Sequence, residues 1–275
     1  MRVLLTNDDG IDAEGIRALR RALLTLPDVD LRVVAPDGNR SATARSITVR
    51  RPLWVKEVSF ADGGVGYATD GTPVDCVRLA SLGLISGWSP DLVVSGINHG
   101  SNLGDDITYS GTVAAALEAL VLGLPGIAVS QQSDALELDF RRSNAFDFEA
   151  ATTFTARLVA ELGTVPLPEG TLLNVNFPGC APEGVEVARL GRRLYRDLLE
   201  LIESDPELPG RHRYRLYGEA VDPADDEPDT DVATVARRRV ALTPLHFDLT
   251  HHAGVQAMLE HSLDHLLEPA GPARR

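Results

Sequence analysis

The chain has 275 residues, of which 44% are hydrophobic, so it is long enough for one large hydrophobic core or two modest ones. Acidic residues outnumber Lys and Arg by 40 to 26, and this formal net charge of −14 argues against a nucleic-acid polymer as partner. The two cysteines, Cys76 and Cys180, form no Cys-x-x-Cys motif, so neither a disulfide framework nor a zinc knuckle is indicated. No leader segment precedes Asp8, and no run of about 18 apolar residues occurs, so we expect a cytoplasmic protein without a membrane partner.

Residues 1–130 alternate short apolar segments with amphipathic ones. Strands are predicted at 2–6, 31–35, 91–95 and 126–130. Apolar residues recur at helical spacing after the first strand, and a second helix is predicted over 112–122. This alternation of strand and helix predicts an α/β fold with a doubly wound, mostly parallel sheet.

The pattern changes later in the chain. Short runs of Thr, Val and Arg between 39 and 67 indicate hairpin strands. Beyond Leu172 we expect irregular structure until a helical pattern returns at 254–267, where His261 and His265 are interpreted as exposed helix positions. The segment 219–231 carries seven acidic residues, which favours a solvated loop.

Two adjacent carboxylates follow the first predicted strand. Asp8 and Asp9 come directly after the apolar run 3–5, and Gly10 indicates a turn behind them. Because ligands of open α/β sheets bind beyond the carboxyl ends of the strands, both side chains are predicted at a binding edge. Neighbouring carboxylates repel each other unless one is protonated or a cation lies between them, which favours a hard divalent metal. An acidic turn is the alternative, since residues 7–10 also have turn composition.

A second candidate region follows another predicted strand. Asn98 comes just after an apolar segment, as Asp8 does, so its amide oxygen is expected beside the two carboxylates. Residues 110–112 then begin a helix of small residues, whose N-terminal N–H groups could bind an anion or could form only a helix cap. Together, a cation site and an anion site on neighbouring loops indicate metal-assisted phosphoryl transfer.

Other motifs narrow the class of enzyme. The loop 36–46 combines hydroxyls with two arginines, so it could supply a neutral metal ligand and contact a phosphate, or it could be a polar surface loop. The P-loop motif, the dinucleotide-binding glycine motif after the first strand and the Gly-x-Ser-x-Gly motif do not occur. Residues 68–72 resemble the motif of aspartyl-phosphate phosphatases, but Ala68 stands at the nucleophilic position, so a phosphatase built on this chain would use water.

Taken together, these motifs resemble the SurE family of 5′/3′-nucleotidases, also called survival protein E. The matching segments are 7–11, 39–41, 71–77, 95–113, 173–178, 229–231 and 242–245. The resemblance implies one catalytic domain over residues 1–275, with a three-layer α/β/α fold and a Rossmann-like core. It also implies one Mn²⁺ or Mg²⁺ per subunit and hydrolysis of nucleoside 5′- and 3′-monophosphates by metal-activated water, with short polyphosphate as a further substrate.

Site residues follow from the resemblance and from the chemistry. The metal ligands implied by the resemblance are Asp8, Asp9, Ser41 and Asn98. The residues expected to bind phosphate are Ser110, Gly111, Thr112 and Asn102. Asp9 is the first candidate for proton acceptor and Asp106 the second. The resemblance also implies a homodimer or homotetramer, in which a C-terminal extension at 185–275 contacts a neighbouring subunit.

Three positions depart from the usual pattern of the family. Ala42 replaces a glycine next to Ser41, Arg45 stands where an amide is common, and His99 stands where a small residue is common. We expect the metal site to survive these changes, while substrate preference can differ. Two other classes stay open: a nucleotide-binding regulator without turnover, and a structural protein whose extension is its main function.

Overall fold

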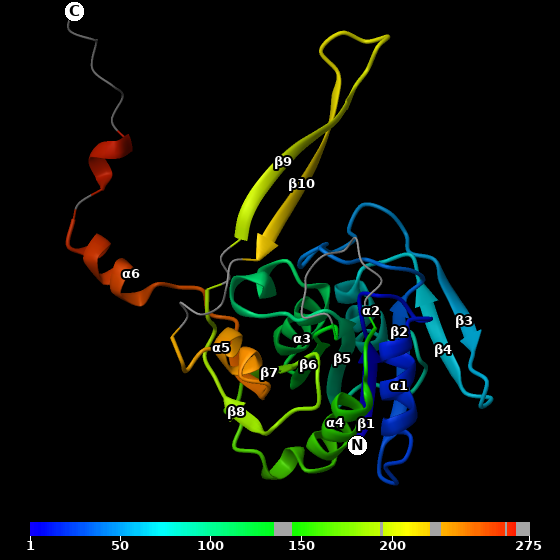
Figure 1. Ribbon diagram of the computed structural model, residues 1–275. Helices are drawn as coiled ribbons and strands as arrows, with labels where there is room; N and C mark the ends of the chain where they lie inside the picture. The colour runs from blue at the N-terminus through cyan, green and yellow to red at the C-terminus, as the bar shows by residue number, and fades with distance from the viewer. Residues whose placement is uncertain (135–144, 193–194, 221–226, 262, 268–275) are drawn as a thin grey trace, which may run out of the picture.

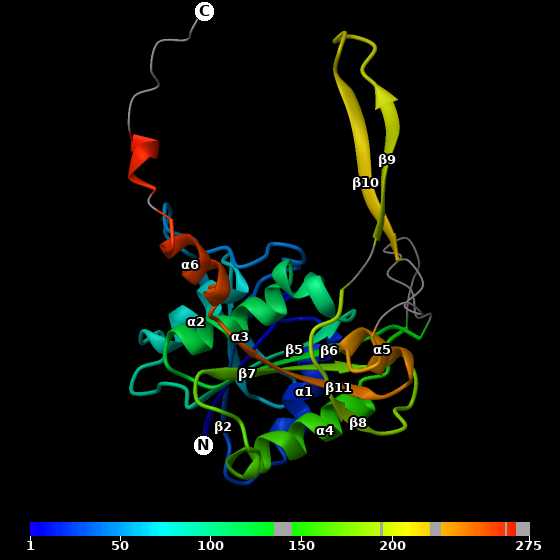
Figure 2. The ribbon, with the colours of Figure 1, turned by 90° about the vertical axis from the view of Figure 1, so that its left-hand side faces the viewer.

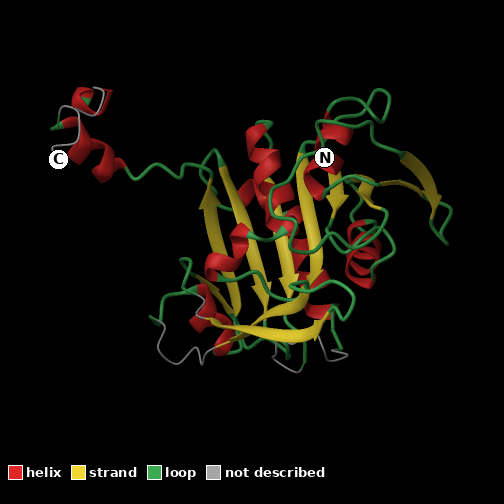
Figure 3. Ribbon diagram, turned by 90° about the horizontal axis from the view of Figure 1, so that it is seen from above, coloured by secondary structure: helices red, strands yellow, loops and turns green. Residues whose placement is uncertain are grey.

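A computed structural model describes residues 1–134, 145–192, 195–220, 227–261 and 263–267. Nine strands of these residues form the central sheet: β1 (Arg2–Thr6), β2 (Asp30–Pro36), β3 (Val55–Ser59), β4 (Val65–Thr69), β5 (Leu92–His99), β6 (Gly126–Gln131), β7 (Thr171–Phe177), β8 (Val185–Val187) and β11 (Val240–His246). Their order is β3-β4-β2-β1-β5-β6-β7-β11-β8. Figure 1 labels most of these strands, and Figure 3 shows strands of the sheet side by side between helices. Strands β3 and β4 pair antiparallel, as do β7 and β11, and the other neighbours are parallel. The predicted doubly wound, mostly parallel sheet is confirmed.

Helices cover both faces of the sheet (Figures 1 and 2). They are α1 (Glu14–Leu23), α2 (Pro73–Ser81), α3 (Gly111–Val121) and α4 (Glu149–Ala160). Side chains of β1 alternate between the faces: Val3 and Leu5 pack with residues of α1 and α4, whereas Leu4 packs with α2 and α3. All three are fully buried, which explains why the strand is an uninterrupted apolar run. The three-layer α/β/α fold is confirmed.

Local sequence explains where two of these helices begin. Thr72 and Asp75 form a capping box at the start of α2, where each side chain accepts the backbone N–H of the other residue. Ser110 caps α3 by accepting the N–H of Val113 at 3.0 Å. A short 3₁₀ helix, η1 (Gly104–Thr108), connects β5 to α3, so the first turn of α3 lies at the carboxyl edge of the sheet.

The structure corrects the prediction for the second half of the chain. The described residues beyond Leu172 contain regular structure that was not predicted: β7, β8 and β11 extend the sheet, and β9 (Tyr195–Ser204) pairs with β10 (His212–Ala220) in a separate hairpin. Where its side chains are described, the hairpin exposes apolar residues: Leu199, Leu201 and Tyr214 are each more than half exposed. An exposed ribbon of this kind does not need the alternation of apolar and polar residues that marks a half-buried strand.

Three further expectations were inexact. Only β3 and β4 form the hairpin expected within 39–67. The predicted helix at 254–267 is divided into α6 (His252–Leu259) and the 3₁₀ helix η4 (Asp264–Leu267), so His261 and His265 do not share a helix. Residues 221–226 of the acidic segment lie outside the described residues.

Two segments extend away from the body of the molecule in both side views (Figures 1 and 2). One is the β9–β10 hairpin and the other comprises α6 and η4. The second segment exposes large apolar side chains, among them Leu259 at 72% and Leu267 at 87%. Within the described part of the chain, no helix is both long enough and apolar enough to cross a membrane.

Candidate metal and phosphate site

The parallel pairing of β1 with β5 brings the candidate metal ligands to one edge of the sheet. Thr6, the last residue of β1, lies opposite Ser95 of β5, and Asp8 and Asp9 follow Thr6 after one residue. Asn98 lies beyond Ser95 on the continuation of β5. The structure therefore places Asp8, Asp9 and Asn98 at the same edge of the sheet.

The turn after β1 is closed by Asn7. Its Oδ1 accepts the N–H of Gly10 at 3.2 Å, and its Nδ2 donates to the carbonyl oxygen of Gly10 at 2.9 Å. Gly10 has a φ of 103°, a left-handed conformation that favours glycine. This local chemistry holds the two intervening aspartates in place at the end of the strand.

Asp8 and Asp9 are both buried, and burial determines their electrostatics. Asp8 is 3% exposed, and burial, followed by the charge of Asp9, raises its pKa to about 6, while hydrogen bonds from Thr112 act in the opposite direction. Burial also raises the pKa of Asp9 to about 6, partly offset by the N–H of His99, which donates to Asp9 Oδ2 at 3.0 Å.

Within the described residues, no basic side chain balances the charges of the two aspartates. No described Lys or Arg forms an ion pair with either one, and the nearest imidazole nitrogen, His99 Nδ1, is 3.9 Å from Asp9 Oδ2. Burial lowers the pKa of His99, although Glu14 and Asp8 act in the opposite direction, so the imidazole does not neutralise the pair at pH 7. A divalent cation would relieve the cost of two buried carboxylates at this position.

The first turn of α3 contacts Asp8 directly. The hydroxyl of Thr112 donates a hydrogen bond to Asp8 Oδ1, and Thr112 is fully buried. A Cβ atom on Gly111 would lie 2.7 Å from Asp8 Cβ and 2.9 Å from Asp8 Oδ2, so only glycine fits. The predicted anion site and the predicted cation site are therefore adjacent. Because the hydroxyl of Thr112 is engaged with Asp8, Ser110 and Gly111 are left as the nearest groups for a phosphate.

Ser41 is connected to the aspartates through Asn39. The Nδ2 of Asn39 donates to Asp9 Oδ1 at 3.3 Å, and its Oδ1 accepts the N–H of Ser41 at 2.8 Å. The N–H of Arg40 donates to the carbonyl oxygen of Asp8 at 2.6 Å. The sequence analysis assigned no role to Asn39. Its position in the segment 39–41, close to Ser41, is the feature of the sequence that could have indicated one.

Two alanines in this loop adopt unfavourable backbone conformations. Ala42 has a φ of 57° and Ala44 a φ of 51°, both in the left-handed region. Each such residue costs about 1–2 kcal/mol relative to a right-handed conformation. The departure from glycine at Ala42 therefore places strain next to Ser41, and other contacts must hold the loop in this shape.

Asn98 and Asn102 have different surroundings. The Nδ2 of Asn98 donates to the carbonyl oxygen of Gly100 at 2.8 Å, which leaves its Oδ1 as the atom that can serve as a ligand. Asn102 is buried, and its Nδ2 donates to Ser130 Oγ at 2.8 Å. Its backbone carbonyl accepts hydrogen bonds from two further side chains, those of Asn174 and Asn176. Asn102 therefore supports the loop from within the core.

Asp106 lies in η1 and is half-buried. The start of η1 is held by Asp231, whose Oδ2 accepts the N–H of Gly104 at 2.9 Å. The other oxygen of Asp231 accepts the N–H of Gly191 at 2.8 Å. Asp231 is fully buried, so the expectation that the acidic segment is solvated is wrong at this residue. The N–H groups of Gly104 and Gly191 lie 127 and 40 positions away from it in the sequence.

An aromatic cluster lies beside Asp9. The ring of His99 stacks on Phe146 and Phe148, with centroid distances of 5.0 and 5.3 Å. The two phenylalanine rings are nearly parallel to each other, with an interplanar angle of 8°. The cluster therefore holds His99 in a fixed orientation next to the acidic pair.

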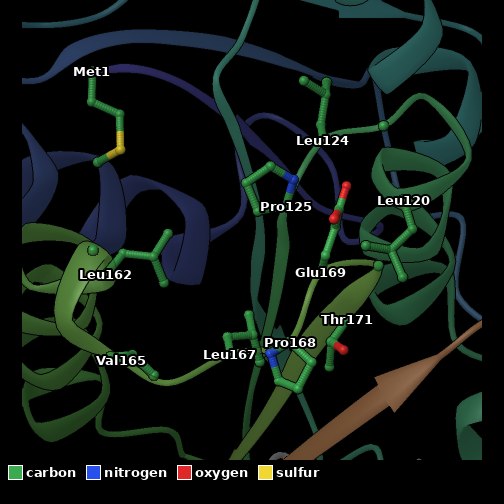
Figure 4. A pocket seen from close by; sticks show the side chains of 13 residues that line it. Met1, Leu120, Leu124, Pro125, Leu162, Val165, Leu167, Pro168, Glu169 and Thr171 are labelled. Carbon is green, nitrogen blue, oxygen red and sulfur yellow. The ribbon is translucent and has the colours of Figure 1, made fainter.

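A cavity of about 630 Å³ lies at the opposite edge of the sheet (Figure 4). It is lined by Met1, Leu120, Gly123, Leu124, Pro125, Leu162, Gly163, Val165, Leu167, Pro168, Glu169, Gly170 and Thr171. These residues precede or begin β1, β6 and β7, and most of them are apolar. Since none of the candidate site residues lines this cavity, it is separate from the acidic pair.

The donor set fits a hard cation better than zinc. Among the described residues, no three His, Cys, Asp or Glu side chains cluster as a metal site. The candidate set instead combines two carboxylates with the hydroxyl of Ser41 and the amide oxygen of Asn98. Oxygen-only donors of this kind suit Mg²⁺ or Mn²⁺.

The fold and the site define a three-layer α/β/α protein with a buried acidic pair facing a helix N-terminus.

A model of the family described as Survival protein SurE matches residues 3–197. The chain is 52% identical over 261 residues to a 5′-nucleotidase SurE of Rubrobacter xylanophilus, and this match covers 94% of this chain and 96% of that protein. A 5′-nucleotidase SurE of Pelotomaculum thermopropionicum is 47% identical, with 92% of each chain covered. The crystal structure of the SurE protein from Aquifex aeolicus matches with a TM-score of 0.77 and 37% identity, covering 95% of this chain and 100% of that one. The chain belongs to the SurE family, as its motifs predicted.

Proposed function

We propose that this protein is a metal-dependent phosphomonoesterase that hydrolyses nucleoside 5′- and 3′-monophosphates to nucleoside and phosphate. The names of its relatives, 5′-nucleotidase SurE, support the 5′ activity. The 3′ activity and hydrolysis of short polyphosphate belong to the proposal as well. The whole chain, residues 1–275, would act as one catalytic domain.

The observation that carries this proposal is the buried pair Asp8 and Asp9 against the first turn of α3. Asp8, Asp9, Ser41 and Asn98 would hold one Mn²⁺ or Mg²⁺ ion. When bound, the ion would supply a Lewis acid that polarises a phosphoryl oxygen and lowers the pKa of a coordinated water.

The side chains around the pair have separable roles in this proposal. The hydroxyl of Ser110 and the N–H of Gly111 bind phosphate oxygens at the positive end of the helix dipole. Thr112 orients Asp8 through its hydroxyl. Asp9 is the first candidate to take the proton of the attacking water. Asp106 is the second candidate for that role.

We also propose that residues 185–275 form the interface of a homodimer or homotetramer. The β9–β10 hairpin exposes Leu199 at 63% and Leu201 at 53%, and its pairing partners come from the hairpin itself. A two-stranded ribbon of this kind is marginally stable alone, so packing against another subunit would stabilise it.

A phosphate-release panel tests the catalytic proposal. Nucleoside 5′-monophosphates, 3′-monophosphates and tripolyphosphate are incubated separately with Mn²⁺, with Mg²⁺ and with chelator. We expect release from the monophosphates with metal and none with chelator. Absence of release under every condition would favour a binding protein without turnover, and equal release in chelator would contradict the proposed metal site.

A further inference from the structure

The loop that carries Ser41 is tied to α3 by the side chain of Arg45. We propose that Arg45 is a positioning residue that holds Ser41 at a defined place relative to the first turn of α3. The inference rests on the proposed function, because Ser41 is one of the four residues assigned to the metal.

The loop has little apolar burial to keep it in place. Ser41, Ala42 and Arg45 are exposed, and Thr43 and Ala44 are only partly buried. Two of these five residues, Ala42 and Ala44, have positive φ angles. A loop that combines exposure with backbone strain keeps one conformation only through specific contacts.

Two such contacts connect the loop to α3. The N–H of Ala44 donates to the carbonyl oxygen of Tyr109 at 3.1 Å, and Tyr109 directly precedes the N-cap Ser110. The Nη2 of Arg45 donates to Glu118 Oε2 at 2.7 Å, in the middle of α3. The loop is thus linked both to the first turn of α3 and to its body.

The contact with Glu118 differs from an ordinary surface ion pair. Glu118 is 1% exposed, and a buried carboxylate without a cationic partner is strongly destabilising, so its arginines are held firmly. The guanidinium carbon of Arg45 also lies 4.6 Å from the ring centroid of Phe247, a cation–π contact with the residue that follows β11. Arg45 is therefore fixed between α3 and the start of the C-terminal segment.

Arg78 offers a matched comparison on the same carboxylate. Its Nε lies 2.7 Å from Glu118 Oε1, and its side chain is 36% exposed, close to the 34% of Arg45. Arg78 belongs to α2, so it does not lie in the loop that carries Ser41. Replacing either arginine by Gln removes one partner of Glu118, but only Arg45→Gln removes a contact between the loop and α3.

The experiment compares Arg45→Gln, Arg78→Gln and Arg45→Lys in the full chain. Hydrogen exchange without metal reports the protection of the Ala44 amide, and calorimetric titration with Mn²⁺ reports metal affinity. We expect Arg45→Gln to lose protection at Ala44 and to weaken Mn²⁺ binding by about 10-fold or more, as seen when an outer-sphere support is removed. Arg45→Lys, which keeps the positive charge, should retain most of the protection at Ala44 and most of the affinity for Mn²⁺.

Excess metal provides a kinetic test of the same idea. The activity of Arg45→Gln should rise toward that of the unmodified protein as Mn²⁺ is increased, because the loop is displaced and no ligand is removed. Arg78→Gln should keep the metal affinity and the exchange of the unmodified protein, even if it is less stable.

The inference is overturned if Arg45→Gln leaves exchange and affinity unchanged, or if Arg78→Gln alters both as much as Arg45→Gln does. The second result would mean that Arg45 acts only through the stability of Glu118 and α3. If the unmodified protein binds no Mn²⁺, the proposed metal site has failed, and the exchange measurement alone decides whether Arg45 anchors the loop.

Discussion

Replacing Asp9 by Asn should make the metal-free protein more stable while removing its activity. Asp9 is buried, and its pKa is raised from 3.8 to about 6 because its charged form is poorly solvated. A carboxyl with a raised pKa binds more protons in the folded state than in the unfolded state. The free energy of unfolding therefore falls as the pH rises from about 4 to about 6.

The size of the effect follows from that pKa. A difference of about 2 pH units corresponds to about 3 kcal/mol of destabilisation at pH 8. The Asn side chain has one acceptor oxygen, whereas Asp9 accepts from both Asn39 and His99, so the substitution loses one hydrogen bond at about 1 kcal/mol. The net expectation is a gain of about 2 kcal/mol at pH 8, shrinking to less than half of that by pH 5.

Urea unfolding with chelator, at pH 5 and at pH 8, measures this gain. Asp28→Asn is the control, because Asp28 is an exposed acid distant from the site and should show no comparable gain. Turnover is measured in parallel with Mn²⁺, where Asp9→Asn should lose most activity. The electrostatic reasoning would be refuted if Asp9→Asn did not raise the free energy of unfolding at pH 8. It would also be refuted if the gain at pH 5 were as large as the gain at pH 8. Unchanged turnover would refute the assignment of Asp9 to the site.

Three other substitutions test separate parts of the structure. Gly111→Ala should lower kcat/KM by at least about 100-fold, because the added Cβ would lie 2.7 Å from Asp8 Cβ. Gly163→Ala is the control and should leave kcat/KM unchanged, because a Cβ atom there would have no atom within 4 Å. If the two variants were equally active, the close approach of Gly111 to Asp8 would be contradicted. Thr112→Val removes the hydroxyl that lowers the pKa of Asp8, so the acidic limb of the pH–rate profile should move to higher pH, whereas Thr112→Ser should not move it. Changing both exposed hairpin residues Leu199 and Leu201 to Lys should reduce the oligomeric mass in light scattering without altering the fold; an unchanged mass would exclude this face from the interface.

Much of the site is recognisable without coordinates because it is local. Asp8 and Asp9 follow an apolar strand, and the rule that ligands gather beyond the carboxyl ends of parallel strands was enough to predict that they share one sheet edge with Asn98. Ser110 was identified as an N-cap from its residue type and its neighbours. Each of these inferences needs only a short stretch of chain.

Other features depend on contacts between distant segments. The hydroxyl of Thr112 was expected to face phosphate, but it is directed to Asp8, which lies 104 positions away in the sequence. Asp231 was grouped with a solvated acidic run, yet it is buried beneath η1. The composition of a segment gives the types of its side chains. It does not show which distant backbone groups those side chains bind through hydrogen bonds.

The division between sequence and tertiary structure is clear in this protein. Strand and helix periodicity, the capping residues and the motif spacing were sufficient for the α/β sheet and the SurE family, because each reflects interactions between near neighbours in the chain. Only the tertiary structure decided that Asp8 and Asp9 are buried together with no basic partner among the described residues, and that Arg45 reaches Glu118 across to α3. Those properties arise from burial and from pairing between segments that are distant in sequence, and no local pattern contains them.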